Sequence, residues 1–172
     1  VGAPALAMAL EVLIGLGVKE FVFVGLAGSL QPEVLAGDIV LCDGALADEG
    51  VSAHYVPQEF LRPCAALTKK LAGVLQKANL SHHTGPNWTT DAMFRETAEE
   101  VAHYQKKNIL TVEMEASAFF AICAQKKVKG AAAFVVSDEL YRLKWEPHFG
   151  EKAIFQNLHA LYQAAVKTLT GK

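Results

Sequence analysis

The sequence predicts an α/β fold whose sheet is parallel for the most part and covered by helices on both faces. Segments with helical periodicity alternate along the chain with short runs rich in β-branched and aromatic residues, which is the pattern of α/β proteins. Several runs are apolar throughout, with residues 131–137 the clearest example, as expected for strands buried on both faces. The 172 residues, 52% of them hydrophobic, suffice for one full-sized core. We therefore predict a single domain over residues 1–172.

In the first half of the chain, local signals define the elements. Residues 3–16 are predicted to form a helix, because a proline stands in the first turn and a glycine follows the end. Residues 21–24 form a short strand that is expected to stop at a glycine-containing turn, residues 25–28. A second strand covers residues 38–41. Residues 46–60 show no clear period and predict a long loop.

In the second half of the chain, helical and extended patterns alternate more regularly. A proline opens the first helix, and the last helix has one apolar side, as expected for a helix packed on a core. The predicted helices are residues 63–78, 96–107, 114–126 and 149–169. The predicted strands are residues 84–89, 109–113 and 131–137.

Charge and cysteine content narrow the class of protein. The net charge is −2 and no basic patch is visible, so we expect no nucleic-acid partner. The three cysteines are scattered without a CxxC pair, which indicates a reduced, cytoplasmic protein. The sequence shows no signal segment and no apolar run long enough to span a membrane. It opens without methionine and runs directly into a helix, so we expect the N-terminal part of the domain to be missing.

Metal and dinucleotide sites are not predicted. The six histidines show neither HxH nor HExxH spacing, which disfavours a metal site. The glycines at the predicted turn do not form GxGxxG, and no helix pattern starts directly after them, which disfavours a dinucleotide cofactor. The same turn, which includes Ala27 and Gly28, would expose backbone N–H groups that could hold an anion or a sugar. A tight connecting turn is the alternative.

Acidic residues follow two of the predicted strands. Ligands of open parallel sheets bind outside the carboxyl ends of the strands. Glu113 and Glu115 flank Met114 where a strand becomes a helix, and two carboxylates there could bind paired hydroxyls such as a ribose diol. A carboxylate at a helix start is also stabilised by the helix dipole, so a purely structural role is the alternative.

Asp138 stands at the end of the most apolar strand. Burial raises the pKa of a carboxyl group, so an acid in such a position can donate a proton near neutral pH. A helix N-cap is the alternative role. The strands that precede Glu115 and Asp138 are joined by one helix, and a right-handed crossover would bring both residues to the same rim of the sheet.

The segment around Asp91 holds the remaining candidates. Met93 and Phe94, with Trp88, could stack on a base, or could be ordinary core under a loop. His54, Arg95 and Arg142 could reach a ligand, although each is more often a surface residue. These three are the weaker candidates.

Five motifs in order resemble the nucleoside phosphorylase/uridine phosphorylase superfamily, which also includes nucleoside hydrolases. The resemblance covers the whole chain, and the Glu-Met-Glu-Ala element followed by Ser-Asp is its most specific part. The motifs are Val24 to Gly28, Gly37 to Val40, Asp48 to Gly50, Val112 to Ala116, and Val136 to Asp138.

The resemblance implies an α/β three-layer sandwich around a mixed, mostly parallel sheet, here without its first strands. It implies cleavage of the N-glycosidic bond of a nucleoside, without a metal or organic cofactor, by a homo-oligomer. Glu115 would hold the ribose hydroxyls with Met114 packed on the sugar. Asp138 would protonate a purine-type base as it leaves, and the segment 89–94 with Met93 and Phe94 would stack on the base.

Two positions depart from the family pattern. Phosphorolytic members usually carry an arginine before the glycine segment and a serine or threonine inside it, where this sequence has Phe23 and Leu26. Phosphorolysis, giving free base and ribose 1-phosphate, is our first interpretation. Hydrolysis with water as acceptor and a non-catalytic nucleoside-binding module are the alternatives.

Overall fold

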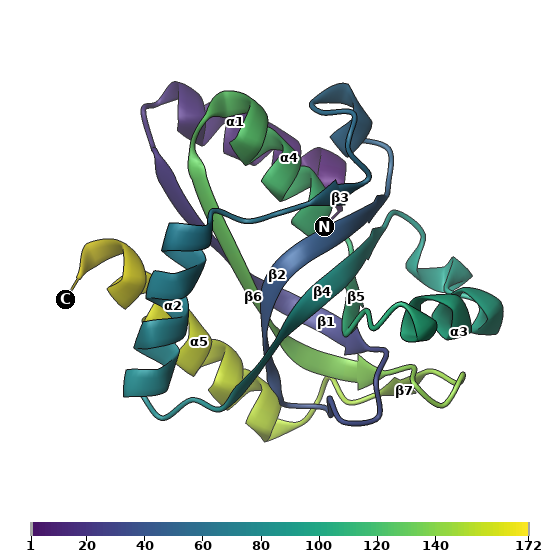
Figure 1. Ribbon diagram of the computed structural model, residues 1–172. Coiled ribbons are helices and arrows are strands. Elements are labelled where there is room, and N and C mark those ends of the chain that lie inside the picture. Colours follow the sequence, from purple (N-terminus) through teal and green to yellow (C-terminus); the bar gives the residue numbers. More distant parts are fainter. Residues whose placement is uncertain (1, 172) are drawn as a thin grey trace.

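The computed structural model describes residues 2–171 and contains every helix and strand that the sequence predicts (Figure 1). The helices are α1 (Ala3–Gly15), α2 (Ala65–Lys77), α3 (Ala98–Lys106), α4 (Ala116–Lys126) and α5 (Lys152–Thr170), with 3-10 turns at Ser52–His54 and Met93–Arg95. The strands are β1 (Glu20–Ser29), β2 (Ile39–Asp48), β3 (Phe60–Leu61), β4 (His82–Thr90), β5 (Thr111–Glu113), β6 (Lys129–Glu139) and β7 (Glu146–Pro147). The short strands β3 and β7 were not predicted. None of the helices within residues 2–171 is long and apolar enough to cross a membrane.

The sheet is mixed, as predicted, but it closes on itself. Its order is β3-β2-β4-β5-β1-β6-β7, and an additional antiparallel pairing of β2 with β6 joins the two sides. Strands β2, β4, β5, β1 and β6 therefore form a closed barrel, and the open central layer of the expected three-layer sandwich needs this correction. The three parallel pairings, β1 with β6, β2 with β4 and β4 with β5, include the two longest ladders.

An irregularity in β2 makes the closure possible. The register of β2 against β4 shifts between Cys42 and Gly44, and such a bulge bends a strand and increases its twist. Before the shift, residues 39–42 pair with β6. After it, Ala45 and Leu46 pair with β3. β2 thus pairs with three strands, β4, β6 and β3, which local sequence patterns do not reveal.

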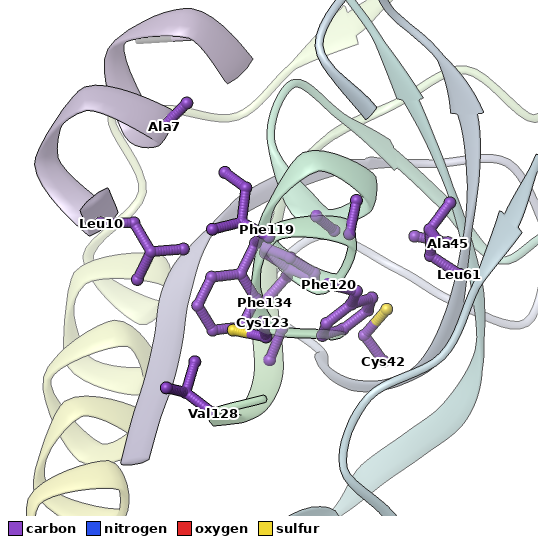
Figure 2. Packing of buried hydrophobic residues seen from close by; sticks show 14 of the residues in the cluster. Ala7, Leu10, Cys42, Ala45, Leu61, Phe119, Phe120, Cys123, Val128 and Phe134 are labelled. Carbon is purple, nitrogen blue, oxygen red and sulfur yellow. The ribbon is translucent and has the colours of Figure 1, made fainter. Parts of the chain in front are cut away.

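Helices cover the barrel on different sides (Figure 1), and each side has its own apolar cluster. Leu10 of α1 and Phe119 and Phe120 of α4 pack with Phe134 of β6 (Figure 2). On another side, α2 and α5 pack together and on β6. Full burial of one such side chain contributes about 1.5–3 kcal/mol, so these two interfaces hold the helices to the barrel.

Trp88 belongs to a third cluster and is core rather than a base-stacking residue. It is 1% exposed and stacks on Tyr104 of α3, with ring centroids 4.4 Å apart. Its indole N–H donates to Asp48 Oδ2 at 3.0 Å. This resolves the alternative that the sequence left open for Trp88.

The predicted turn at residues 25–28 is wrong, because β1 continues through it to Ser29. Neither Gly25 nor Gly28 has a positive φ. Gly28 is required by a close approach instead: a Cβ there would lie 2.6 Å from Leu140 Cδ1 and 2.9 Å from Asp138 Oδ2. The glycine therefore makes room for neighbours on β6 and beyond, and does not shape an anion-binding loop.

Candidate active site

A cavity of about 770 Å³ opens where β1, β5 and β6 meet α1. Its volume lies in the range of small-molecule sites. All eight residues singled out in the sequence line it: Asp138, Glu113, Met114, Glu115, Met93, Phe94, Gly28 and Ala27. His54, Arg95 and Arg142 are not among the lining residues of the described chain.

Asp138 lies within β6 and is 9% exposed. It pairs with Gly28 on β1 and with Pro147 on β7, so it does not cap a helix. Ser137 Oγ donates to its Oδ1 at 2.7 Å, and the Trp145 indole N–H donates to its Oδ2 at 2.9 Å. Both oxygens of this buried carboxyl group are thus held in a fixed orientation at the cavity wall.

Glu113 is buried and accepts four hydrogen bonds. Asn87 Nδ2 and Thr89 Oγ1 donate to Oε1 at 2.6 and 2.7 Å, and the backbone N–H groups of Glu115 and Ala116 donate to Oε2 at 2.6 and 2.8 Å. Burial raises the pKa of Glu113 to about 7, against the lowering effect of these bonds. With both oxygens engaged, Glu113 fixes the start of α4.

Glu115 stands at the N-cap position of α4 and is half-buried. The Gly2 N–H donates to its Oε1 at 2.5 Å, so the start of α1 meets the start of α4 here. Met114, also half-buried, lines the same part of the cavity. A carboxylate and a thioether therefore border one region of the cavity. The buried Glu113 holds the backbone of Glu115 and Ala116 by its hydrogen bonds.

Glu115 and Asp138 share the cavity for a different reason from the one expected. β5 and β6 are not neighbours, because β1 lies between them. β5 runs antiparallel to β1, whereas β6 runs parallel to it, so no parallel crossover joins β5 to β6. Both pair with the same carboxyl-terminal part of β1: Gly28 is the register partner of Val112 and of Asp138. The shared partner brings the two acids together.

Aromatic side chains form one rim of the cavity. Met93 and Phe94 lie in the 3-10 turn and are exposed. Trp145 and Phe149, from a later part of the chain, also line the cavity. Their ring centroids lie 6.1 Å apart. Exposed aromatic faces beside a cavity can stack on a planar ligand.

A further carboxyl group, that of Glu96, lines the cavity. Burial and, secondly, the negative charge of Asp138 raise the pKa of Glu96 to about 7. The two groups therefore interact electrostatically across the site. Strongly raised carboxyl pKa values are common at functional sites.

Part of the cavity lining is apolar. Phe23 and Leu26 of β1 line it with Leu6 of α1, and Phe23 packs edge-on against Phe134 with ring centroids 5.6 Å apart. No lysine, arginine or histidine lines the cavity within residues 2–171. Its ionisable lining is acidic.

The sequence pattern of the Phosphorylase superfamily (PNP_UDP_1) matches residues 1–169. The chain belongs to this superfamily. The match confirms the resemblance inferred from the five motifs.

Relatives of this superfamily chain are nucleoside phosphorylases by name. It is 34% identical over 142 residues to a guanosine phosphorylase of Halorubrum lacusprofundi, covering 81% of this chain and 58% of the relative. It is 30% identical over 155 residues to a uridine phosphorylase of Treponema pallidum, covering 83% and 60%. A DeoD-type purine nucleoside phosphorylase of Streptococcus pneumoniae is 30% identical over 142 residues, covering 81% and 60%. The chain thus spans 58 to 60% of the length of these relatives.

The fold of the superfamily chain resembles a solved structure of the P. knowlesi homologue of P. falciparum PNP. The TM-score is 0.80 at 25% sequence identity, covering 95% of this chain and 68% of the other. The α/β prediction is therefore confirmed at the level of fold.

Trp145 and Glu96 line the cavity but were not among the candidates that the sequence indicated. Trp145 lies between β6 and β7, where no periodic pattern marks a position as buried or exposed. For Glu96, the sequence predicts only a place at the start of a helix. A tryptophan seven residues after a candidate acid was the available signal for the first, and nothing local distinguished the second.

Proposed function

We propose that this chain forms the nucleoside-binding part of an enzyme that cleaves the N-glycosidic bond of a purine-type nucleoside by phosphorolysis. The products would be a free base and ribose 1-phosphate. One observation carries the proposal: Asp138 and Glu115, on separate elements, line one cavity of nucleoside size. Relatives named guanosine, uridine and purine nucleoside phosphorylase support the reaction class.

The proposed chemistry divides the cavity into a sugar side and a base side. Glu115 binds the ribose hydroxyls, and Met114 packs against the sugar. As the C1′–N bond breaks, its electron pair moves to the base and positive charge develops on the ribose, which a nearby carboxylate stabilises. Asp138 donates a proton to a ring nitrogen of the departing base. An oxygen of the acceptor then bonds to C1′.

The base side would be formed by Met93, Phe94 and the exposed face of Trp145. A purine offers a ring nitrogen that can accept a proton from Asp138, which favours a purine-type base. Burial and, secondly, the charge of Asp138 raise the pKa of Glu96 to about 7. It would keep a second proton in the site near neutral pH.

The cavity lining constrains the acceptor, phosphate or water, less than it constrains the nucleoside. Phosphate binding needs cationic or N–H donors, and the lining within residues 2–171 supplies no cationic side chain. We propose that the cation comes from outside this lining, as in a homo-oligomer whose subunits complete each other's sites. The apolar Phe23 and Leu26 also favour a second candidate, hydrolysis with water as acceptor. A nucleoside-binding module without turnover is the third possibility.

We also propose a cytoplasmic protein that needs no cofactor and uses phosphate as a co-substrate. All three cysteines are free thiols, as is usual in reducing compartments. Residues 1–172 would form a single domain.

Product analysis tests the proposal. The protein is incubated with a panel of purine and pyrimidine nucleosides, with and without phosphate, and free base, ribose and ribose 1-phosphate are measured. Release that depends on phosphate supports phosphorolysis, and release of free ribose without phosphate supports hydrolysis. The absence of release with retained nucleoside binding would contradict both.

Variants then locate the acid. Asp138→Asn keeps the size and polarity of the side chain but supplies no transferable carboxyl proton, so turnover should fall far more than affinity. Glu115→Ala should weaken nucleoside binding and rate together. Glu99→Gln on the exposed side of α3 is the control. Equal loss of turnover and affinity in Asp138→Asn would remove its role as general acid.

A further inference from the structure

The short ladder between β6 and β7 presents two different faces. Successive residues of a strand point to opposite sides. Asp138 faces the cavity, so Glu139 points away from it. Glu139 is the register partner of Glu146 on β7. His148 follows two residues later on the same face as Glu146, and its N–H donates to Ser137 O at 3.0 Å.

The three side chains on this outer face converge. One carboxylate oxygen from Glu139, one from Glu146 and one imidazole nitrogen from His148 all lie within 4.8 Å of one another. Within residues 2–171, none of these three side chains is hydrogen-bonded to another of them. The donor atoms are therefore close but do not satisfy each other. Zinc ligands sit at about 2.0–2.2 Å from the ion, so donors that share one lie about 3.5 Å apart.

His148 has one nitrogen committed and one without a partner. Its Nδ1 is 2.6 Å from Glu151 Oε1. Its Nε2 is buried and has no hydrogen-bond partner among residues 2–171, which is uncommon for a buried polar atom. A histidine that donates one ring N–H to a carboxylate and offers the other nitrogen as a lone pair is the usual arrangement of a metal-binding histidine. Glu151 would thus orient the ring as an outer-sphere partner.

The two carboxylates retain free capacity. Glu139 is 9% exposed, and its Oε1 accepts the Ala36 N–H at 2.9 Å. Glu146 Oε2 is 3.4 Å from Arg142 Nη1 in an exposed pair. Such exposed ion pairs contribute little, so Arg142 can be displaced. Each carboxylate thus has an oxygen available for a further ligand.

We propose that Glu139, Glu146 and His148 form a binding site for a divalent transition-metal ion of the Zn²⁺ type, with Glu151 holding His148 in place. A mixed set of imidazole and carboxylate ligands suits Zn²⁺ better than Mg²⁺, which prefers oxygen ligands alone. The absence of HxH and HExxH spacing does not exclude this site, because its ligands come from two strands that pair in space. The site lies outside the cavity and is independent of the proposed reaction.

A bound ion would link β7 to β6 and so hold the adjacent Trp145 against Asp138. The alternative occupant of His148 Nε2 is a proton, which would make an imidazolium among three carboxylates without any metal.

Calorimetry with ZnCl₂ on the full chain, without a polyhistidine tag and after removal of metals with a chelator, distinguishes the two occupants. We expect saturable binding of one Zn²⁺ per chain and no saturation with MgCl₂. Glu146→Gln and His148→Gln should each weaken Zn²⁺ binding by roughly tenfold or more. His159→Gln, on the exposed surface of α5, is the matched control and should bind as the unmodified chain does.

A second readout follows the link to the cavity. Trp88 is fully buried in the core, so a change in tryptophan emission on adding Zn²⁺ should come from Trp145 and vanish in Trp145→Phe. The absence of saturable Zn²⁺ binding would overturn the site, as would binding that is unchanged in both ligand variants. If His148→Gln fails to fold, Glu146→Gln alone decides, since that side chain's one hydrogen bond is the exposed one with Arg142.

Discussion

The indole N–H of Trp145 donates to Asp138 Oδ2 at 2.9 Å, from a position seven residues further along the chain. Ser137 Oγ donates to the other oxygen of the same carboxyl group. The two donors therefore hold this carboxyl group in one orientation at the cavity wall. Trp145 is 48% exposed, so a side chain at the cavity surface sets the orientation of the proposed acid.

Trp145→Phe is expected to lower turnover by up to about tenfold, because Asp138 loses one of the two hydrogen bonds that orient it and such a bond is worth roughly 0.5–1.5 kcal/mol. The Phe variant keeps an aromatic ring beside Phe149 but lacks the donor. Steady-state kinetics should show the loss mainly in kcat. Trp145→Ala removes ring and donor together and should also raise KM, and equal behaviour of the two variants would argue against a role for the N–H.

Gly28→Ala is expected to displace Asp138. The added Cβ would lie 2.6 Å from Leu140 Cδ1 and 2.9 Å from Asp138 Oδ2, distances that folded proteins do not tolerate without movement. Nucleoside turnover should fall, and unfolding in urea should show a loss of about 1–3 kcal/mol. Gly73→Ala in α2 meets nothing within 4 Å and should stabilise the chain by about 0.5–1 kcal/mol. Retention of full activity by Gly28→Ala would show that the approach is not tight.

Glu96 should make stability depend on pH. Its folded pKa is about 7 against an ordinary value of 4.5, so between these values the folded state binds more protons than the unfolded state. Stability should therefore fall as pH rises through this window and level off above it. Glu96→Gln should flatten the fall in thermal scans from pH 4.5 to 8, although Glu113, raised for a similar reason, keeps part of it. Glu99→Gln, exposed on the following helix α3, should leave the slope unchanged, and an unchanged slope in Glu96→Gln would contradict the assignment.

Thr89→Val tests the support beneath Glu115. The Thr89 hydroxyl donates to Glu113 Oε1 at 2.7 Å and accepts the Ser117 N–H at 3.0 Å. A valine of similar shape leaves both groups short of a partner in a buried place, at a cost of about 2–3 kcal/mol. Chemical denaturation measures the loss. Thr84→Val, exposed on the same strand, should change stability by less than about 0.5 kcal/mol; similar values for the two variants would count against the network.

The elements and the candidate residues were largely predictable, because both are encoded locally. The apolar run that became β6 and the helix after Glu115 are set by periodicity over a few residues. The eight candidates stand near the ends of apolar runs or at helix starts in the sequence, and all of them line one cavity. Their catalytic and binding roles remain predictions that the variants above test.

The arrangement of the elements was not predictable from the same signals. An apolar strand pattern shows that β6 is covered on both faces, but not that β2 pairs with it and closes a barrel. Gly25 and Gly28 suggested a turn because glycine permits unusual backbone angles, whereas Gly28 is there to leave space for Asp138. That space is a property of two strands 110 positions apart and has no local signature.

The ladder between β1 and β6 also limits when the sheet can form during synthesis of the chain. Glu20 pairs with Lys129, and Ser29 with Glu139, so the first strand must wait for more than a hundred residues before its long parallel partner exists. Pairings between such distant segments form slowly and leave strand edges unprotected meanwhile. A ribosome-bound chain that ends before residue 129 can pair β1 only with β5, through Gly28 and Ser29, so the rest of the edge that later holds β6 stays exposed until synthesis is nearly complete.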